Sequence, residues 1–172
     1  MKYKQKVDFI SDILLIIIGI ILLILSILNI GNVKIIFIAV MSTYAIVNFL
    51  QYFLTKQTKD YEGLYTFISS VVIALMALFL YQDNNLTIAL LLLGWTFIMA
   101  IIKFIKTDYY NDRHDRMWKV KMFTLVIFIL AGTFSSLAML TIDNKLLILG
   151  YYFFIHGVLE IIEPITKYLI SK

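Results

Sequence analysis

A stretch late in the chain combines ionisable side chains with a long apolar run. Residues 144–164 read NKLLILGYYFFIHGVLEIIEP and include His156, Glu160 and Glu163. These positions are four and then three residues apart, so on a helix they share one face. One histidine and two carboxylates resemble a metal-ligand set, but the spacing matches no established helical motif such as H-E-x-x-H. A carboxylate in such a run can instead hold a proton or pair with a lysine.

The same layout occurs twice earlier in the chain. Residues 32–52 and 85–106 are similar apolar runs, and the three segments align on Ala45, Ala100 and Gly157. In each segment a polar or charged residue follows the aligned position by three places, and another follows it by six. These residues are Asn48, Lys103 and Glu160, then Gln51, Lys106 and Glu163. A period of roughly 55–57 residues predicts an internal repeat.

Composition places these runs in a membrane. Hydrophobic residues make up 62% of the 172 residues and charged residues only 15%, whereas a soluble domain of this size needs a more polar surface. Cysteine is absent, which excludes disulfides, thiolate metal sites and a cysteine nucleophile. With Pro164 as the only proline and no low-complexity linker, we expect residues 1–172 to form a single transmembrane domain.

Six apolar runs have the length of membrane-spanning helices. They lie at about 9–28, 34–55, 63–81, 86–106, 119–140 and 145–168, each near the ~20 residues that a bilayer requires. The first follows MKYKQKVD and lacks a small-x-small cleavage site, so we interpret it as an uncleaved transmembrane helix. Three short turns place Asn32, Asn85 and Asn144 directly before the next helix, where an asparagine can act as the N-cap.

The expected fold is an all-α integral membrane protein made of three parallel, pseudo-repeated helical hairpins. The repeats are about 9–56, 62–107 and 118–170. A two-helix unit returns the chain to its starting side, so the symmetry axis would follow the membrane normal. The outgoing helix of each hairpin carries two small residues seven apart, which would allow close helix packing in lipid. These pairs are Gly19 and Ser26, Ser70 and Ala77, and Ala131 and Ala138.

The basic residues predict an orientation. All fifteen Lys and Arg residues except Lys34 and Lys145 fall on the side of the two termini. The positive-inside rule therefore places both termini in the cytoplasm of a multi-pass protein of the bacterial cytoplasmic (inner) membrane. The same distribution explains the net charge of +4 without a nucleic-acid partner, because these residues lie in short loops between apolar helices.

Glu160 is the polar residue that most needs a partner. It lies about 5–6 Å inward of the midpoint of its helix, where an unpaired charge costs about 2.5–3.5 kcal/mol. Lys103, at similar depth in the hairpin arrangement, is the expected partner, while Lys106 and Glu163 would reach the headgroups. Asp8 and Asp12 lie near the start of the first helix, where its dipole favours them, and need no further role. The charged stretch around His114 is expected to be a solvated loop.

The repeat pattern resembles the HdeD-like family of small six-helix bacterial membrane proteins. The matching stretches are IGIILLIL around Gly19, LLLLGWTFIMAIIKFIK at 90–106 and LILGYYFFIHGVLEIIE at 147–163. The resemblance implies an inner-membrane protein linked with acid or envelope stress, without a known catalytic mechanism. It transfers no active-site residues.

Two functional hypotheses follow. The first is a non-enzymatic membrane protein of the HdeD-like type, acting through helix packing, self-association or a membrane-protein partner. The alternative is a small transporter or channel for protons, ions or a small polar solute, which would use the polar cluster. That cluster consists of Asn48, Gln51, Lys103, His156, Glu160 and Glu163. An enzyme with a cofactor is not expected, because the sequence contains no G-x-S-x-G, P-loop or G-x-G-x-x-G motif.

Overall fold

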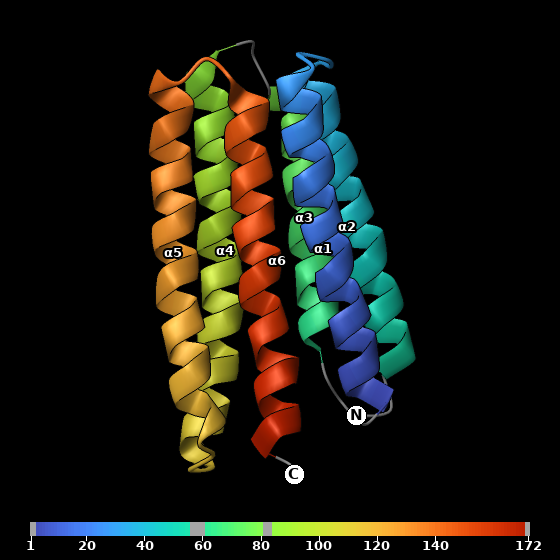
Figure 1. Ribbon diagram of the computed structural model, residues 1–172, viewed down its shortest axis with the longest axis vertical. Coiled ribbons are helices and arrows are strands. Elements are labelled where there is room, and N and C mark those ends of the chain that lie inside the picture. Colours follow the sequence, from blue (N-terminus) through green and yellow to red (C-terminus); the bar gives the residue numbers. More distant parts are fainter. Residues whose placement is uncertain (1–2, 56–60, 81–83, 171–172) are drawn as a thin grey trace.

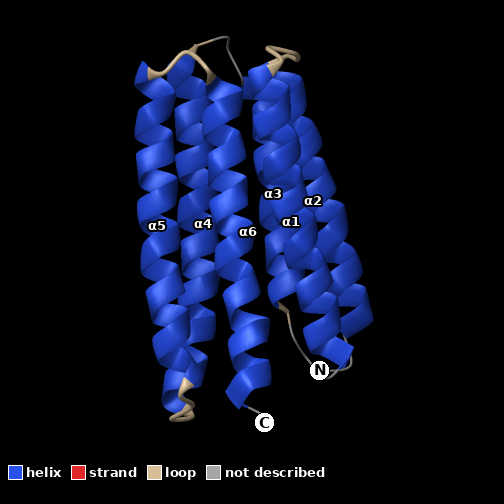
Figure 2. Cartoon of the chain, viewed as in Figure 1, coloured by secondary structure: helices blue, strands red, loops and turns tan. Residues whose placement is uncertain are grey.

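The computed structural model describes residues 3–55, 61–80 and 84–170, and these residues form six helices with no strand among them (Figure 2). The helices are α1 Tyr3–Ile27, α2 Val33–Thr55, α3 Glu62–Leu80, α4 Asn85–Asp112, α5 Met117–Thr141 and α6 Lys145–Ile170. Each contains a stretch long and apolar enough to cross a membrane. The prediction of an all-helical chain with six spanning helices is confirmed.

Two boundary errors are the largest. α1 begins at Tyr3 rather than near residue 9, and α4 ends six residues later than predicted. The helix continues past Lys106 to Asp112, so much of the expected loop is helical. Polar residues beyond the apolar run can remain helical in water, and here Arg113 stacks over the Tyr109 ring at 4.3 Å. The turn that follows is short and contains His114, whose φ of 53° is left-handed. The predicted solvated loop around His114 is therefore reduced to this turn between α4 and α5.

The three asparagine turns lie at one end of the bundle and the two termini at the other (Figure 1). The side-chain oxygen of Asn32 accepts from the backbone N–H of Ile35 at 3.2 Å, and that of Asn144 accepts from Leu147 at 3.2 Å. Both are N-caps, as predicted.

The third cap is Asn84, because its side chain accepts from the Thr87 N–H at 2.8 Å. The prediction of Asn85 was wrong by one residue, since two consecutive asparagines offered the same signal. Asn85 is instead the first residue of α4 and donates to the Leu140 carbonyl at 3.5 Å. The earlier part of that turn, residues 81–83, lies outside the described residues.

The helices are ordered as a ring. The most extensive contacts join α1 to α6, α4 to α5, and α2 to α3. Smaller contacts join α1 to α2, α3 to α4, and α5 to α6. Helices that are consecutive in the chain therefore lie side by side, and the contact between α1 and α6, the most extensive of all, closes the ring. The contact between two helices joined through an asparagine turn is smaller than any of the other three contacts in the ring.

Small residues allow the close contacts of this ring. Gly19 of α1 lies so near α6 that a Cβ added to it would be 2.5 Å from the Phe154 backbone nitrogen. Gly150 and Gly157 of α6 approach α1 in the same way. Without a hydrophobic driving force between helices in lipid, such close van der Waals packing holds the helices together.

The predicted small-residue faces are partly correct. Gly19 and Ser26 are buried, as are Ser70 and Ala77. In α5, however, Ala131 and Ala138 are only half-buried. The buried small residues of α5 are Gly132 and Ser136, and Gly132 packs against the Thr96 side chain of α4. The prediction failed here because α5 has small residues on two neighbouring faces, and spacing alone does not select between them.

We expect Gly19→Ala to destabilise the protein. The added methyl meets the backbone of α6, which cannot move aside as a flexible side chain could, so a cost of about 1–3 kcal/mol is expected. Gly94→Ala is the matched control, because nothing lies within 4 Å of a Cβ at that position. Thermal unfolding of the two variants in detergent measures the difference. Equal midpoints would contradict the close α1–α6 contact.

Candidate functional site

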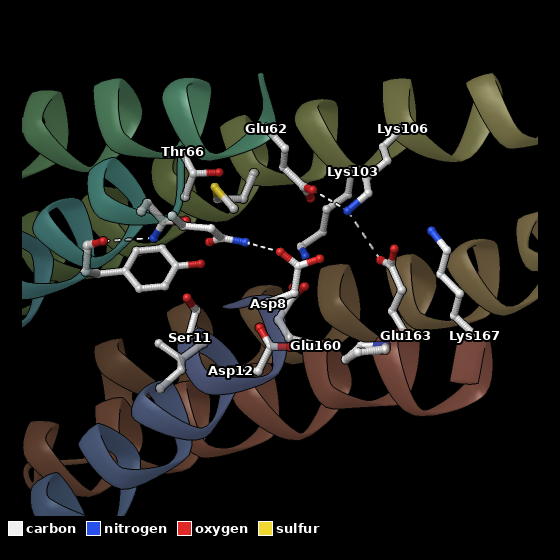
Figure 3. Close-up of a pocket in the computed structure, with 16 residues that line it drawn as sticks. Asp8, Ser11, Asp12, Glu62, Thr66, Lys103, Lys106, Glu160, Glu163 and Lys167 are labelled. Carbon is white, nitrogen blue, oxygen red and sulfur yellow. Dashed lines mark hydrogen bonds and ion pairs between the residues drawn. The ribbon is translucent and has the colours of Figure 1, made fainter. Parts of the chain in front are cut away.

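A polar cavity of about 60 Å³ lies inside the bundle (Figure 3), and the residues that line it come from the part of each helix nearer the termini. Residues of α1, α2, α3, α4 and α6 line it. Its ionisable residues are Asp8, Asp12, Glu62, Lys103, Lys106, Glu160, Glu163 and Lys167. Asn48 and Gln51 line it as well. The structure therefore brings five of the six predicted cluster residues to one cavity, and the sixth, His156, lies directly behind it.

The deepest charged group is the pair formed by Lys103 and Glu160. Lys103 of α4 donates from Nζ to Oε1 of Glu160 on α6, as the sequence predicted. His156 Nε2 lies 3.0 Å from the same oxygen. The Lys103 ammonium also lies 5.3 Å from the centre of the Phe128 ring. The pair thus joins α4 to α6 and supplies both charges with a partner inside the bundle.

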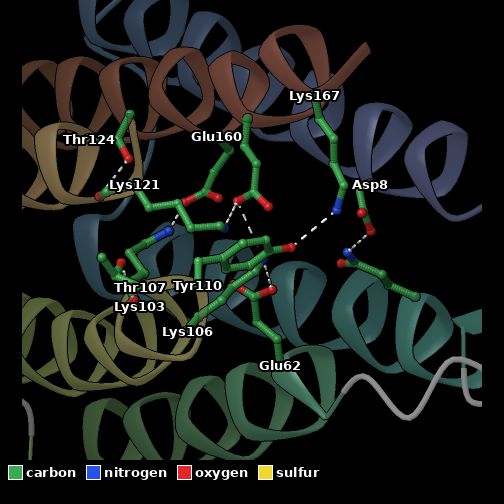
Figure 4. A network of polar contacts seen from close by, with 12 residues as sticks. Asp8, Glu62, Lys103, Lys106, Thr107, Tyr110, Lys121, Thr124, Glu160 and Lys167 are labelled. Carbon is green, nitrogen blue, oxygen red and sulfur yellow. Dashed lines mark hydrogen bonds and ion pairs between the residues drawn. The ribbon is translucent and has the colours of Figure 1, made fainter. Parts of the chain in front are cut away.

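A second set of ion pairs lies one turn nearer the termini (Figure 4). Lys106 pairs with Glu62 of α3 and lies 3.4 Å from Glu163 of α6. Lys121 of α5 pairs with Glu163 as well. From the sequence we expected Lys106 and Glu163 to reach the headgroups and assigned them no partner within the bundle. Partners on α3 and α5 hold them inside the bundle, so each is little more than one-fifth exposed.

Tyr110 and Lys167 complete the network at its outer edge. Lys167 of α6 donates to the Tyr110 hydroxyl of α4 at 3.1 Å. Lys121 lies 4.8 Å from the centre of the same ring. Gln51 of α2 donates to Asp8 of α1 at 2.7 Å. Every one of the six helices therefore contributes to the polar network.

Sequence reasoning missed Asp12, Glu62 and Lys121 as members of this site. A signal for Asp12 and Lys121 was present in the helix faces. Asp12 lies seven residues before Gly19, which is on the buried face of α1. Lys121 likewise lies seven residues before Phe128, which is on the buried face of α5. Extending each buried face toward the termini would have found both. Glu62 begins α3, and no spacing pointed to its contact with Lys106.

Aromatic rings close the bundle behind His156. Its ring centre lies 4.7 Å from Phe128, 5.4 Å from Trp95 and 6.1 Å from Tyr152. Trp95 and Tyr152 are fully buried, and the Tyr152 hydroxyl lies 3.0 Å from Thr96 Oγ1. Beyond these rings, toward the asparagine turns, most of the core is apolar and includes Leu92, Leu149 and Met139. The polar cavity therefore ends at His156.

The residues do not form the metal site considered from the sequence. In the described part of the chain, no group of three or more histidines, cysteines and carboxylates could hold a metal ion. His156 and Glu160 bond to each other, whereas Glu163 faces Lys106 and Lys121. An ammonium group occupies the direction from which a cation would have to approach Glu163.

Comparison of the chain with protein-family models, with curated proteins and with solved structures finds no match. The resemblance to the HdeD-like family therefore stays a prediction, and the functional argument depends on the site itself.

We expect Lys103→Met to destabilise the protein more than the double variant Lys103→Met with Glu160→Gln. The single change leaves Glu160 charged in the bundle, and removing one partner of a buried pair costs about 3–5 kcal/mol. Neutralising Glu160 as well removes the unpaired charge. Thermal unfolding of wild type, both single variants and the double variant forms a cycle that isolates the pair. Additive effects would show that the two side chains do not interact.

Proposed function

We propose that this protein is a non-enzymatic polytopic membrane protein that takes a proton or a small ion into the cavity between its helices. This corresponds to the transporter or channel alternative of the sequence analysis. The observation that carries it is the charged cavity of about 60 Å³ enclosed by apolar helices. Ionisable residues within membrane segments are costly, and they commonly mark ion pathways and proton relays.

The size of the cavity limits what it can hold. One water molecule occupies about 10–15 Å³ of such a cavity, so 60 Å³ accommodates only a few molecules or ions of the size of water. Pockets for drug-sized ligands are typically about 300–1,000 Å³. A proton, or a small ion with one or two waters, fits this space, whereas a larger polar solute does not.

The distribution of polar groups supports entry from one side. The ion-paired residues lie in the half of the bundle nearer the termini, and the aromatic residues behind His156 separate them from the asparagine turns. The basic residues favour a cytoplasmic location of the termini by the positive-inside rule. The proposed entry is therefore from the cytoplasm of a bacterial cell.

The ring of helices supports the proposed architecture of three parallel pseudo-repeats. If the hairpins are α1–α2, α3–α4 and α5–α6, then the three most extensive contacts are the three contacts between hairpins. Equivalent interfaces repeated around a closed ring are what an axis along the membrane normal would produce. In this arrangement Asn48, Lys103 and Glu160 lie at one depth around the cavity.

Action through helix packing or a partner, as the HdeD-like resemblance suggests, is the competing proposal. The largely apolar core between His156 and the asparagine turns favours it. The hydroxyl groups buried there, such as those of Ser26 and Ser136, are bonded to Asn144 and to the Gly132 carbonyl and carry no charge. Under that proposal the ion pairs serve only to hold the helices in place, and no ion crosses the bilayer.

A flux assay separates the two proposals. Purified protein is placed in liposomes that contain a pH-sensitive dye, and a potential is applied with potassium and valinomycin. We expect proton or ion flux above that of empty liposomes, reduced at least tenfold in Glu160→Gln. Asp143→Asn, at the asparagine-turn end, is the control that should keep wild-type flux. Liposomes that remain as tight as empty ones with wild-type protein would refute the transport proposal.

A further inference from the structure

We propose that the cavity contains a binding site for a monovalent alkali cation, formed by Asp12 of α1, Asn48 and Gln51 of α2, and Thr66 of α3. All four residues line the cavity. The inference rests on the proposed function, because it names the ion that the cavity would take up. The charges, the amide orientations and a buried hydroxyl group support it independently of one another.

Asp12 is a carboxylate without an ion-pair partner among the described residues. Of the cavity carboxylates, Glu160 pairs with Lys103, and Glu62 and Glu163 pair with Lys106. Asp8 accepts from Gln51. Asp12 is the one that makes neither a hydrogen bond nor an ion pair with any described residue. A carboxylate held in a protein interior needs a partner, and a cation from solution can supply it.

The second argument concerns two amide groups whose orientation is fixed. Asn48 Nδ2 donates to the Tyr44 carbonyl at 2.8 Å, and Gln51 Nε2 donates to Asp8 Oδ1 at 2.7 Å. Both acceptors are oxygens that can only accept, so rotating either amide by 180° would place two oxygens against each other. The carbonyl oxygens of Asn48 and Gln51 therefore point away from these acceptors and are left for the cavity, although the Asn48 side chain also bonds to the Tyr44 side chain.

The third argument is the Thr66 side chain. It is only 2% exposed and lines the cavity, yet its hydroxyl group forms no hydrogen bond with a described residue. The hydroxyl oxygen is therefore free to serve as a ligand in the cavity. Figure 3 shows Thr66 on the wall opposite Ser11 and Asp12, so the hydroxyl and the Asp12 carboxylate face one space from two sides.

The ligand set favours a monovalent ion. A carboxylate, two amide carbonyls and a hydroxyl are hard oxygen ligands, which suit alkali and alkaline-earth cations rather than transition metals. A single uncompensated carboxylate neutralises one positive charge. Lys103 and Lys106 line the same cavity and would repel a second charge on the ion. Calcium sites, in contrast, usually combine several carboxylates with six to eight oxygen ligands.

Sodium binding to the purified full-length protein in detergent tests the proposal. Equilibrium binding of ²²Na⁺ is measured at constant ionic strength, with choline as the replacing cation. We expect saturable binding of about one ion per chain. Asp12→Asn should weaken it at least tenfold, and Thr66→Val, which removes the hydroxyl at nearly constant volume, several-fold. Asp115→Asn, in the turn between α4 and α5, should bind as wild type does.

The outcomes are distinguishable from those of the flux assay. No saturable sodium binding by the wild type, or unchanged binding in both Asp12→Asn and Thr66→Val, overturns the site. If Asp12→Asn does not fold, as judged by its elution profile and helical circular dichroism, the sodium binding of Thr66→Val alone decides whether the site exists. Proton flux without sodium binding would refute this site and leave the proposed function. Sodium binding without any proton or ion flux would support this site and refute the proposed function.

Discussion

A charge inside the hydrocarbon region must have a partner inside the protein, and this constraint organises the half of the bundle nearer the termini. Lys103 and Glu160 join α4 to α6, Lys106 and Glu62 join α4 to α3, and Lys121 joins α5 to α6 through Glu163. Each of these side chains would destabilise its helix if that helix lay alone in lipid. The pairs therefore select the arrangement of the helices as well as stabilise it, since a rotated helix would leave a charge unpaired.

The other half of the bundle follows a different constraint. Here helix backbones approach each other directly, as at Gly19 and Gly150, and the interior is filled by aromatic rings and leucines. Close packing excludes water and leaves no space for an ion. The protein is thus polar and hollow toward its termini and apolar and filled toward its asparagine turns, and the boundary between the two regions is His156 with the rings that surround it.

Much of the fold could be predicted because membrane helices have a required length and the turns have recognisable caps. Alignment of the three apolar segments placed Lys103 and Glu160 at similar depth, and the structure shows them in contact. Depth was predictable, because it depends on position along a helix. Direction around the helix axis was not, which is why Glu62 was missed as a partner of Lys106. Lys121 was missed because the buried face of α5 was not extended to the start of that helix. The choice of Asn84 over Asn85 as a cap depends on one hydrogen bond, which adjacent identical residues do not reveal.

The helix dipole was a sufficient local explanation for the acidic residues of α1, and for that reason their place in the cavity was not predicted. The dipole of a helix does stabilise acidic residues in its first turns, and Asp8 and Asp12 needed no further explanation from the sequence. The ring, however, brings α1 against both α6 and α2, so these carboxylates line the same cavity as Lys103. The first helix thereby contributes acidic groups to a site whose lysines lie on α4, α5 and α6.

The central claim is that a water-accessible polar cavity enters the bundle from the side of the termini and stops at His156. The chain has no cysteine, so a single Ser11→Cys substitution places one thiol on the wall of this cavity. The direct measurement is labelling of this thiol by a small membrane-impermeant reagent, applied separately to each side of oriented vesicles. We expect labelling from the side of the termini and none from the side of the asparagine turns. Labelling from the opposite side, or from neither side in folded protein, would contradict the account.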